Sequence, residues 1–304
     1  MVLALFLVIF DSLGGAFMRE IYLRSTVNPI FKALRGKPHT LILGSSTTMT
    51  GLDPALLGDG VHNASENGQS IFYAAAFLRH LPAESGLETV IFGLDVQDAV
   101  RGHKSEFMKY LKTLAPLAGY DDVLLSKYEL SDPFVRMKYF SNLYPYQGRG
   151  RRIVFEWRRP VRSGNGYTPH DGSERRNPLR KPDDKLTPLP APEESLEGLS
   201  QIVEAARARN LQLLVVALPW RDEPFPARQP RYAAFVEQAR AIMAGDGICD
   251  LTWETDPLIA ELAQDETLFL DRQHLNGKGA EIYSRFIAQR IANRCGAPSR
   301  LSSP

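Results

Sequence analysis

The chain has 304 residues, 44% hydrophobic and 23% charged, a globular composition that excludes disordered, collagen-like and coiled-coil chains. Its 36 basic and 35 acidic residues give a formal net charge of +1, so no global field attracts nucleic acid, and none is expected as a partner. Two cysteines exclude a four-cysteine zinc site and a disulfide-rich miniature fold.

The first element of the chain is apolar. Residues 2–10 form an unbroken apolar run, and the pattern continues more weakly to Met18. The run is shorter than the roughly 20 residues of a membrane-spanning helix and lacks the basic leader and cleavage site of a signal peptide. Three interpretations stay open: a membrane anchor that begins upstream of this sequence, an uncleaved interfacial or signal-like helix, and a buried core helix. We favour an anchor at residues 1–30, although basic residues, which normally stay cytoplasmic, follow it: Arg19, Arg24, Lys32, Arg35 and Lys37.

Strands and helices alternate along the rest of the chain. Apolar runs predict buried strands at 39–44, 89–93 and 211–218, with weaker strands at 60–63 and 248–251. Helical patterns cover 70–81, 195–209, 231–244 and 277–292. We therefore predict an α/β fold with three layers, α/β/α, around a five-stranded parallel, flavodoxin-like sheet, together with the apolar N-terminal helix and one large insertion.

That insertion, residues 96–194, interrupts the alternation within a domain that spans residues 31–304. Its first half, 104–140, has a helical pattern, whereas 145–192 is rich in Arg, Pro, Gly and Asp and predicts an irregular tip. Because both ends of the insertion leave the carboxyl edge of the sheet, we expect it to cap a site there. Trp157 and Tyr167 are its candidate substrate-binding side chains.

A serine follows the first predicted strand. Gly44-Ser45-Ser46 stands at a strand-to-helix turn, where a serine hydroxyl can lie close to backbone N–H groups that hold an oxyanion. Taken alone, such a sequence is more often a simple turn.

A second motif lies near the end of the chain. In Asp271-Arg272-Gln273-His274-Leu275-Asn276, the three-residue spacing can place the Asp271 carboxylate against Nδ1 of His274 while Nε2 points outward. A nucleophilic serine needs this arrangement of base and orienting acid.

Together these motifs resemble those of the SGNH (GDSL-type) hydrolases over about residues 38–95 and 196–293. The resemblance implies Ser46 as nucleophile, with Asp271 and His274 completing a catalytic triad. It also implies an oxyanion hole formed by Ser46, by Gly68 and, as a further donor, by Asn67. No metal and no cofactor are expected.

The chain is most similar to a membrane-anchored branch of that superfamily, which includes alginate O-acetylation proteins and, more distantly, the teichoic-acid D-alanyl transfer protein. The motifs in order are the apolar segment, Gly-Ser-Ser, Gly51-Leu52-Asp53-Pro54, Leu218-Pro219 and the late Asp-x-x-His-Leu-Asn. The resemblance implies acyl-ester chemistry on a cell-surface or exopolysaccharide glycan in the periplasm or cell exterior. It also implies a membrane-bound O-acyltransferase as partner.

One departure affects the third motif of the family, Gly-x-Asn-Asp. Here Gly93-Leu94-Asp95 places Asp95 at or next to the asparagine that supplies an oxyanion-hole amide, and an ionised carboxylate cannot donate a hydrogen bond. Either Asp95 points elsewhere, as a possible substrate-binding group, or another donor such as Asn67 takes the role. The departure also supports an alternative: a catalytically inactive protein of the same fold that binds a glycan or a membrane O-acyltransferase.

Other groups favour structural roles. A basic stretch with Phe155 and Trp157 interleaved is more often a solvated surface than a glycan or headgroup site; it comprises Arg149, Arg151, Arg152, Arg158, Arg159 and Arg162. The histidines at 62, 80, 103 and 170 show no metal-ligand spacing. Cys249 and Cys295 lie in neighbouring predicted elements, where a disulfide can form, but the pattern favours separate buried cysteines.

Overall fold

The computed structural model describes residues 2–95, 114–118, 121–129, 132–158, 165–167, 169, 193–223, 225, 230–252 and 256–295. At its centre is a five-stranded, all-parallel sheet with the strand order β2-β1-β3-β4-β5. The strands are β1 (Thr40–Gly44), β2 (Val61–Asn63), β3 (Thr89–Gly93), β4 (Gln212–Val216) and β5 (Ile248–Asp250). This is the predicted fold class, and each observed strand ends within two residues of its predicted bounds.

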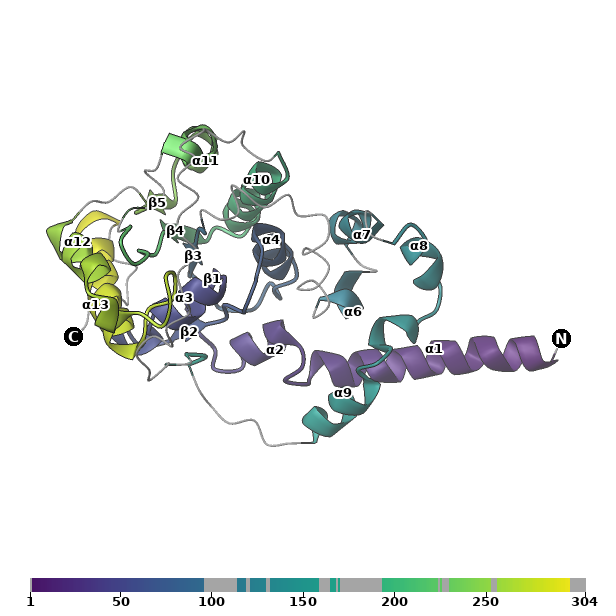
Figure 1. Ribbon diagram of the computed structural model, residues 1–304. Coiled ribbons are helices and arrows are strands. Elements are labelled where there is room, and N and C mark those ends of the chain that lie inside the picture. Colours follow the sequence, from purple (N-terminus) through teal and green to yellow (C-terminus); the bar gives the residue numbers. More distant parts are fainter. Residues whose placement is uncertain are drawn as a thin grey trace.

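Helices cover both faces of the sheet because successive strand residues point to opposite faces. Leu41 and Leu43 face one core, which contains α4 (Ile71–Arg79), α10 (Glu193–Ala208) and α11 (Ala233–Met243). Ile42 faces the other core, which contains α12 (Pro257–Gln264) and α13 (Gly277–Arg294). These helices form the two outer layers (Figure 1).

The helices that matter for the site begin at side-chain caps. Ser45 caps α3 (Ser46–Gly51), and Ser70 caps α4. Asn276 accepts hydrogen bonds from the N–H groups of Lys278 and Gly279 at the start of α13. Such caps satisfy amides that have no partner inside the helix, so each helix begins where the sequence provides a polar residue.

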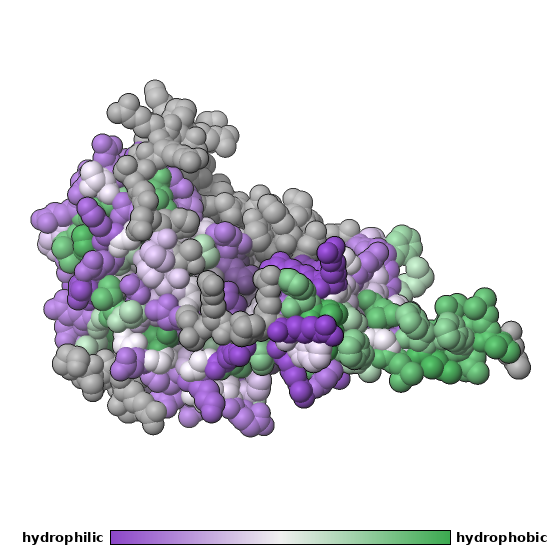
Figure 2. All heavy atoms as spheres, turned by 90° about the horizontal axis from the view of Figure 1, so that it is seen from below, coloured by the Kyte–Doolittle hydropathy of each residue, from purple (hydrophilic) through white to green (hydrophobic). Residues whose placement is uncertain are grey.

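The N-terminal segment is the helix α1 (Val2–Leu23), which projects from the α/β body (Figure 1). Among the described residues it is the one helix long and apolar enough to cross a membrane, and only 6% of its most apolar 18-residue window is buried. Figure 2 shows its surface as a continuous hydrophobic rod beyond the body. The exposure excludes the buried core helix among the three interpretations. The short helix α2 (Pro29–Leu34) then leads into β1.

The described part of the insertion contains α6 (Ala115–Ala118), α7 (Asp122–Glu129), α8 (Val135–Lys138) and α9 (Gly150–Trp157). The prediction of an irregular chain from 145 onward is wrong at α9. This helix is amphipathic: Ile153 is fully buried, the helix packs against α1, and its arginines face outward. A sequence dense in Arg is compatible with a helix because Arg is a good helix former. The insertion also contacts α4, where Arg79 pairs with Asp121 at 2.9 Å.

Cys249 and Cys295 form a disulfide with a Cα–Cα distance of 5.5 Å. The preference for two separate buried cysteines is therefore wrong. Cys249 lies in β5 and Cys295 is the residue at which α13 ends, and packing of both on the second core brings them together.

Candidate active site

Ser46, His274 and Asp271 form a continuous chain of hydrogen bonds at the carboxyl edge of the sheet. The Ser46 Oγ lies 2.8 Å from Nε2 of His274. The Nδ1 atom of the same ring lies 2.7 Å and 2.9 Å from the two carboxylate oxygens of Asp271. Because Nδ1 must donate its proton to the carboxylate, Nε2 is left as the acceptor for the serine hydroxyl. This is the geometry that the two sequence motifs predict, across 228 residues of chain.

The Asp271 side chain is held as an anion. Burial raises the pKa of its carboxyl, but hydrogen bonds from the His274 ring and from the backbone N–H groups of Gln273 and His274 outweigh burial and lower that pKa to about 2. The carboxylate therefore stays ionised throughout the pH range in which an imidazole can act as a base.

Ser46 is positioned by close contacts at the start of α3. It is the first residue of that helix, so its N–H is free of intrahelical bonding. Two glycines, Gly44 and Gly93, end neighbouring strands and leave space for the side chain of Thr48. A Cβ at Gly93 would lie 1.9 Å from the Thr48 Oγ1, and one at Gly44 would lie 2.4 Å from it. Both glycines are thus required for the packing of α3 on the sheet.

The loop that carries Asp271 and His274 is tied at its base. Phe269 and Leu275 are fully buried and pair across the loop as an antiparallel bridge. The Leu270 N–H donates to the His274 carbonyl at 2.8 Å. His274 keeps 24% of its side chain exposed, so the loop presents the imidazole to solvent on a rigid base.

The candidate oxyanion-hole residues Asn67 and Gly68 lie in the turn between β2 and α4. On one side of this turn the Glu66 N–H donates to the Gly44 carbonyl at 3.2 Å. On the other side the Gly44 N–H donates to Oε1 of Gln69 at 2.8 Å. Both bonds attach the turn to Gly44, two residues before Ser46. The left-handed φ of +67° at Gly68 suits a residue without a Cβ.

Gln69 was missed by the sequence analysis. Its side chain is 4% exposed and fixes the distance between the turn and the end of β1. A glutamine after Asn-Gly has no distinctive pattern of its own; only its place next to the predicted Gly68 pointed toward it.

The Asp95 side chain is a hydrogen-bond acceptor and not a donor to an oxyanion. Ser45 Oγ donates a hydrogen bond of 3.1 Å to its carboxylate, so this side chain accepts rather than donates. The contact links the end of β3 to the N-cap residue of α3. Whether Asp95 binds substrate remains a prediction.

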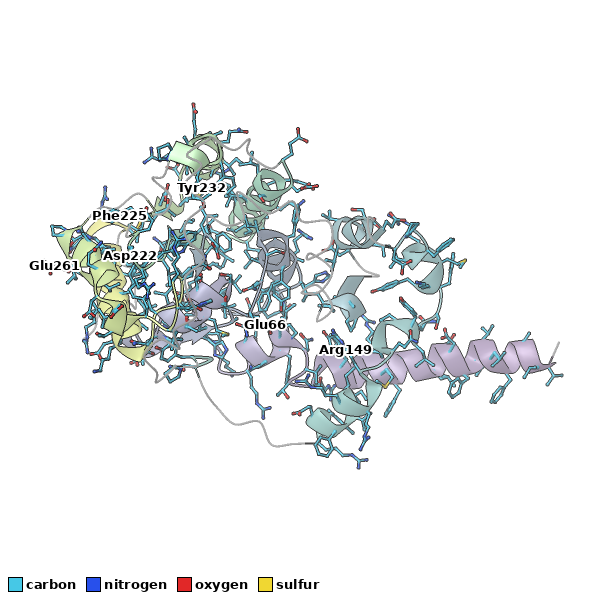
Figure 3. The ribbon with its side chains drawn as sticks, viewed as in Figure 1. Glu66, Arg149, Asp222, Phe225, Tyr232 and Glu261 are labelled. Atoms are coloured by element: carbon cyan, nitrogen blue, oxygen red, sulfur yellow. A yellow bond between two sulfur atoms is a disulfide. The ribbon has the colours of Figure 1, made fainter. Side chains whose placement is uncertain are left out.

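A cavity of about 330 Å³ borders this edge of the sheet. Its lining includes Asn67 and Glu66 from the turn, Met49 from α3, His62 from β2 and Lys32 from α2. Figure 3 shows Glu66 beside α2, on the side of the body that faces α1. Burial raises the pKa of the Glu66 carboxyl. Burial, and then the charge of Lys32, lower the pKa of His62 to about 4, so this imidazole is neutral at physiological pH.

The two aromatic candidates from the insertion are separated by the fold. Tyr167 packs against the second core, and its neighbour Gly166 lines the cavity, where the Asn165 carbonyl accepts a hydrogen bond of 2.7 Å from the Asn63 N–H. Trp157 instead is the last residue of α9, the helix that packs against α1. The insertion therefore contributes to the cavity through Gly166. Arg159 and Arg162 lie outside the described residues.

No group of three or more His, Cys, Asp or Glu side chains among the described residues is arranged to hold a metal ion. No family model matches the chain, and no curated protein matches it either.

Proposed function

We propose that the chain is a serine-dependent acyl-ester enzyme of the SGNH type, an O-acyltransferase or esterase. The observation that carries this proposal is the hydrogen-bonded series Ser46–His274–Asp271. A serine that donates to a neutral imidazole, itself oriented by an ionised carboxylate, is activated for attack on an ester carbonyl.

The reaction proceeds in two steps. Ser46 Oγ forms a bond to the acyl carbon while its proton passes to Nε2 of His274, and that proton then leaves on the departing alcohol. In the second step His274 removes a proton from water or from a sugar hydroxyl, whose oxygen displaces Ser46 from the acyl group, and His274 returns that proton to the released Ser46 Oγ. The N–H groups of Ser46 and Gly68 are the proposed donors to the oxyanion, with the Asn67 amide as the third.

The proposed substrate is a cell-surface or exopolysaccharide glycan, and the proposed source of acyl groups is a membrane-bound O-acyltransferase. The cavity is lined by Lys32, Glu66 and Asn67 and not by Ser46 or His274, so it supports a polar acceptor that reaches the triad from the side of Asn67. An anchored location with the body in the periplasm or cell exterior is supported by α1 and by the disulfide, since disulfides persist in oxidising compartments.

Steady-state hydrolysis of a small aryl acetate tests the enzymatic proposal. Ser46→Ala should abolish turnover, and Asp271→Asn should lower kcat by roughly 10³–10⁴-fold because the imidazole loses its orienting anion. Ser200→Ala is the matched control, since Ser200 is a half-buried serine on α10 whose hydroxyl donates to Glu204. Equal rates for Ser46→Ala and the parent chain would refute the proposal.

The second candidate is a non-catalytic protein of the same fold that binds a glycan or a membrane acyltransferase. The observation that favours it is Asp95, a hydrogen-bond acceptor at the end of β3 where the family has a donor. It predicts glycan binding that is unchanged in Ser46→Ala, together with no ester turnover by the parent chain. Turnover lost in that variant would exclude it.

A further inference from the structure

Three large apolar side chains are exposed together at α8. Phe134, Met137 and Phe140 are 64%, 63% and 86% exposed, whereas Val135 on the opposite side of the same turn is 3% exposed. Phe134 and Met137 are three residues apart and therefore share one face of the helix. One face of this helical turn is thus apolar and exposed, whereas Val135 on the other face is buried in the core.

The loop that follows this apolar face contacts the exposed part of α1. The loop directly after Phe140 surrounds Asp11, the single charged residue in the first half of α1. Ser141 Oγ donates to the Asp11 carboxylate at 2.6 Å, and the N–H groups of Asn142 and Leu143 donate at 2.8 Å and 3.3 Å. The Asn142 side-chain amide adds a fourth bond at 3.0 Å.

Two glycines make the contact close. A Cβ at Gly15 would lie 2.2 Å from the Cβ of Asn142, and one at Gly14 would lie 3.3 Å from the Leu143 side chain. The loop 141–143 therefore has a fixed position along α1, at residues 11–15. Large apolar side chains of α1 are exposed on both sides of this contact: those from Val2 to Phe10 are 47% exposed or more, and Leu13 and Phe17 are 67% and 58% exposed.

We infer that the N-terminal part of α1 and the apolar face of α8 form one membrane-contact surface, with the boundary between hydrocarbon and headgroups at the level of Asp11. A carboxylate with four hydrogen bonds and the polar loop 141–143 fit the headgroup region, whereas the uncovered stretch before them fits hydrocarbon. Phe134, Met137 and Phe140 continue the apolar surface at that boundary.

We assign a lipid bilayer as the occupant because the loop directly after Phe140 binds Asp11 of α1, whose preceding residues are apolar and exposed. In Figure 1, α8 lies on the side of the body from which α1 projects. In Figure 2, a smaller hydrophobic area adjoins the hydrophobic rod at that end of the body. Residues 11–23 of α1 then separate the boundary from the α/β body by about 18 Å along the helix axis. The inference does not depend on the catalytic role of Ser46.

Depth-dependent fluorescence quenching tests this surface in the full chain reconstituted into phosphatidylcholine–phosphatidylglycerol vesicles. Both native cysteines are in the disulfide, so a single introduced cysteine can carry an environment-sensitive fluorophore. The probe sites are Phe140→Cys, Phe6→Cys as the deep reference in α1, and Leu258→Cys as the matched control. Leu258 is a 45% exposed apolar residue on α12, at the far end of the body (Figure 1). Circular dichroism verifies that each labelled variant is folded.

The fluorophore at position 140 should be quenched more strongly by lipids with a nitroxide near the headgroup than by lipids with a nitroxide deep in the acyl chain. The fluorophore at position 6 should show the reverse order, and the fluorophore at position 258 should not be quenched by either lipid. A 140 probe that behaves like the 258 probe while the 6 probe is quenched would overturn the inference and leave the α8 face to a protein partner. Absence of quenching at both 6 and 140 would overturn the membrane contact of α1 as well.

Discussion

The backbone N–H of Arg221 donates a hydrogen bond of 2.8 Å to the carbonyl oxygen of Arg272. Arg221 follows β4, and Arg272 lies between Asp271 and His274. The neighbouring Trp220 adds a second contact, because the Arg272 guanidinium lies 5.9 Å from the centroid of its ring. The loop that carries Asp271 and His274 is thus fastened to the segment after β4 by residues outside the candidate triad.

We expect Trp220→Ala to lower kcat more than it changes KM. Trp220 is 6% exposed, and its loss should cost about 3–5 kcal/mol of unfolding free energy. A loosened Arg272 lets His274 move relative to Ser46, which should lower kcat roughly 10- to 100-fold. Aryl acetate kinetics at a temperature where circular dichroism shows a folded variant measure this. Leu258→Ala is the control, and a kcat equal to that of the control would show that Trp220 does not position the loop.

Gly93→Ala should destabilise the protein and displace Ser46. The added Cβ would lie 1.9 Å from Thr48 Oγ1 and 2.9 Å from Thr48 Cβ, so α3 must shift. Overpacking of this kind costs about 1–3 kcal/mol. Gly36→Ala is the matched control because nothing lies within 4 Å of its Cβ. Urea unfolding and aryl acetate turnover are measured for both variants. Equal unfolding midpoints and equal turnover for Gly93→Ala and Gly36→Ala would contradict the prediction.

The disulfide should stabilise the C-terminal part of the domain. It joins cysteines 46 residues apart, and a loop of this length corresponds to about 4 kcal/mol of unfolding free energy. Asp271 and His274 lie within the closed loop. We expect Cys249→Ser/Cys295→Ser to unfold at lower urea concentration than the parent chain, and dithiothreitol to have the same effect on the parent only. Identical unfolding of variant and parent would indicate that the bond contributes nothing.

Removal of Lys32 should raise the pKa of His62. Burial and the positive charge of Lys32 lower that pKa to about 4. Without the charge, the protonated imidazole is less disfavoured, so the midpoint moves upward while burial keeps it below the usual value of about 6.5. Proton–nitrogen NMR of the His62 ring during a pH titration measures it. Lys32→Arg keeps the charge and should leave the pKa of His62 near its value in the parent chain. An unchanged His62 pKa in Lys32→Ala would show that burial alone lowers it.

The sequence predicts the sheet because apolar strand patterns are local. The three candidate triad positions come from two short motifs together with the resemblance to the SGNH hydrolases. Apolar runs that end in Gly predict the strands, and Ser46 follows the first of them. His274 follows no strand: its loop reaches Ser46 through the bridge Phe269–Leu275 and the hydrogen bond from Arg221 to Arg272. What the sequence does not predict depends on contacts between distant segments. The disulfide requires β5 and the end of α13 to meet, and α9, which buries Ile153, packs against α1.

The positioning residues were missed for a similar reason. Gln69 and Trp220 act through a backbone amide and a neighbouring side chain, and no periodicity or spacing marks such contacts in advance. Asp95 shows the converse: the sequence identified its unusual chemistry, but only the hydrogen bond from Ser45 shows where the carboxylate is held.

Covalent labelling with a fluorophosphonate, followed by peptide mapping, tests the role of Ser46 most directly. The reagent phosphonylates a serine only where a base removes the hydroxyl proton and donors hold the oxyanion. We expect one adduct on the peptide that contains Ser46, absent in Ser46→Ala, strongly slowed in Asp271→Asn and unchanged in Ser200→Ala. A folded parent chain that gains no adduct at Ser46, or equal labelling in Ser46→Ala, would contradict the account.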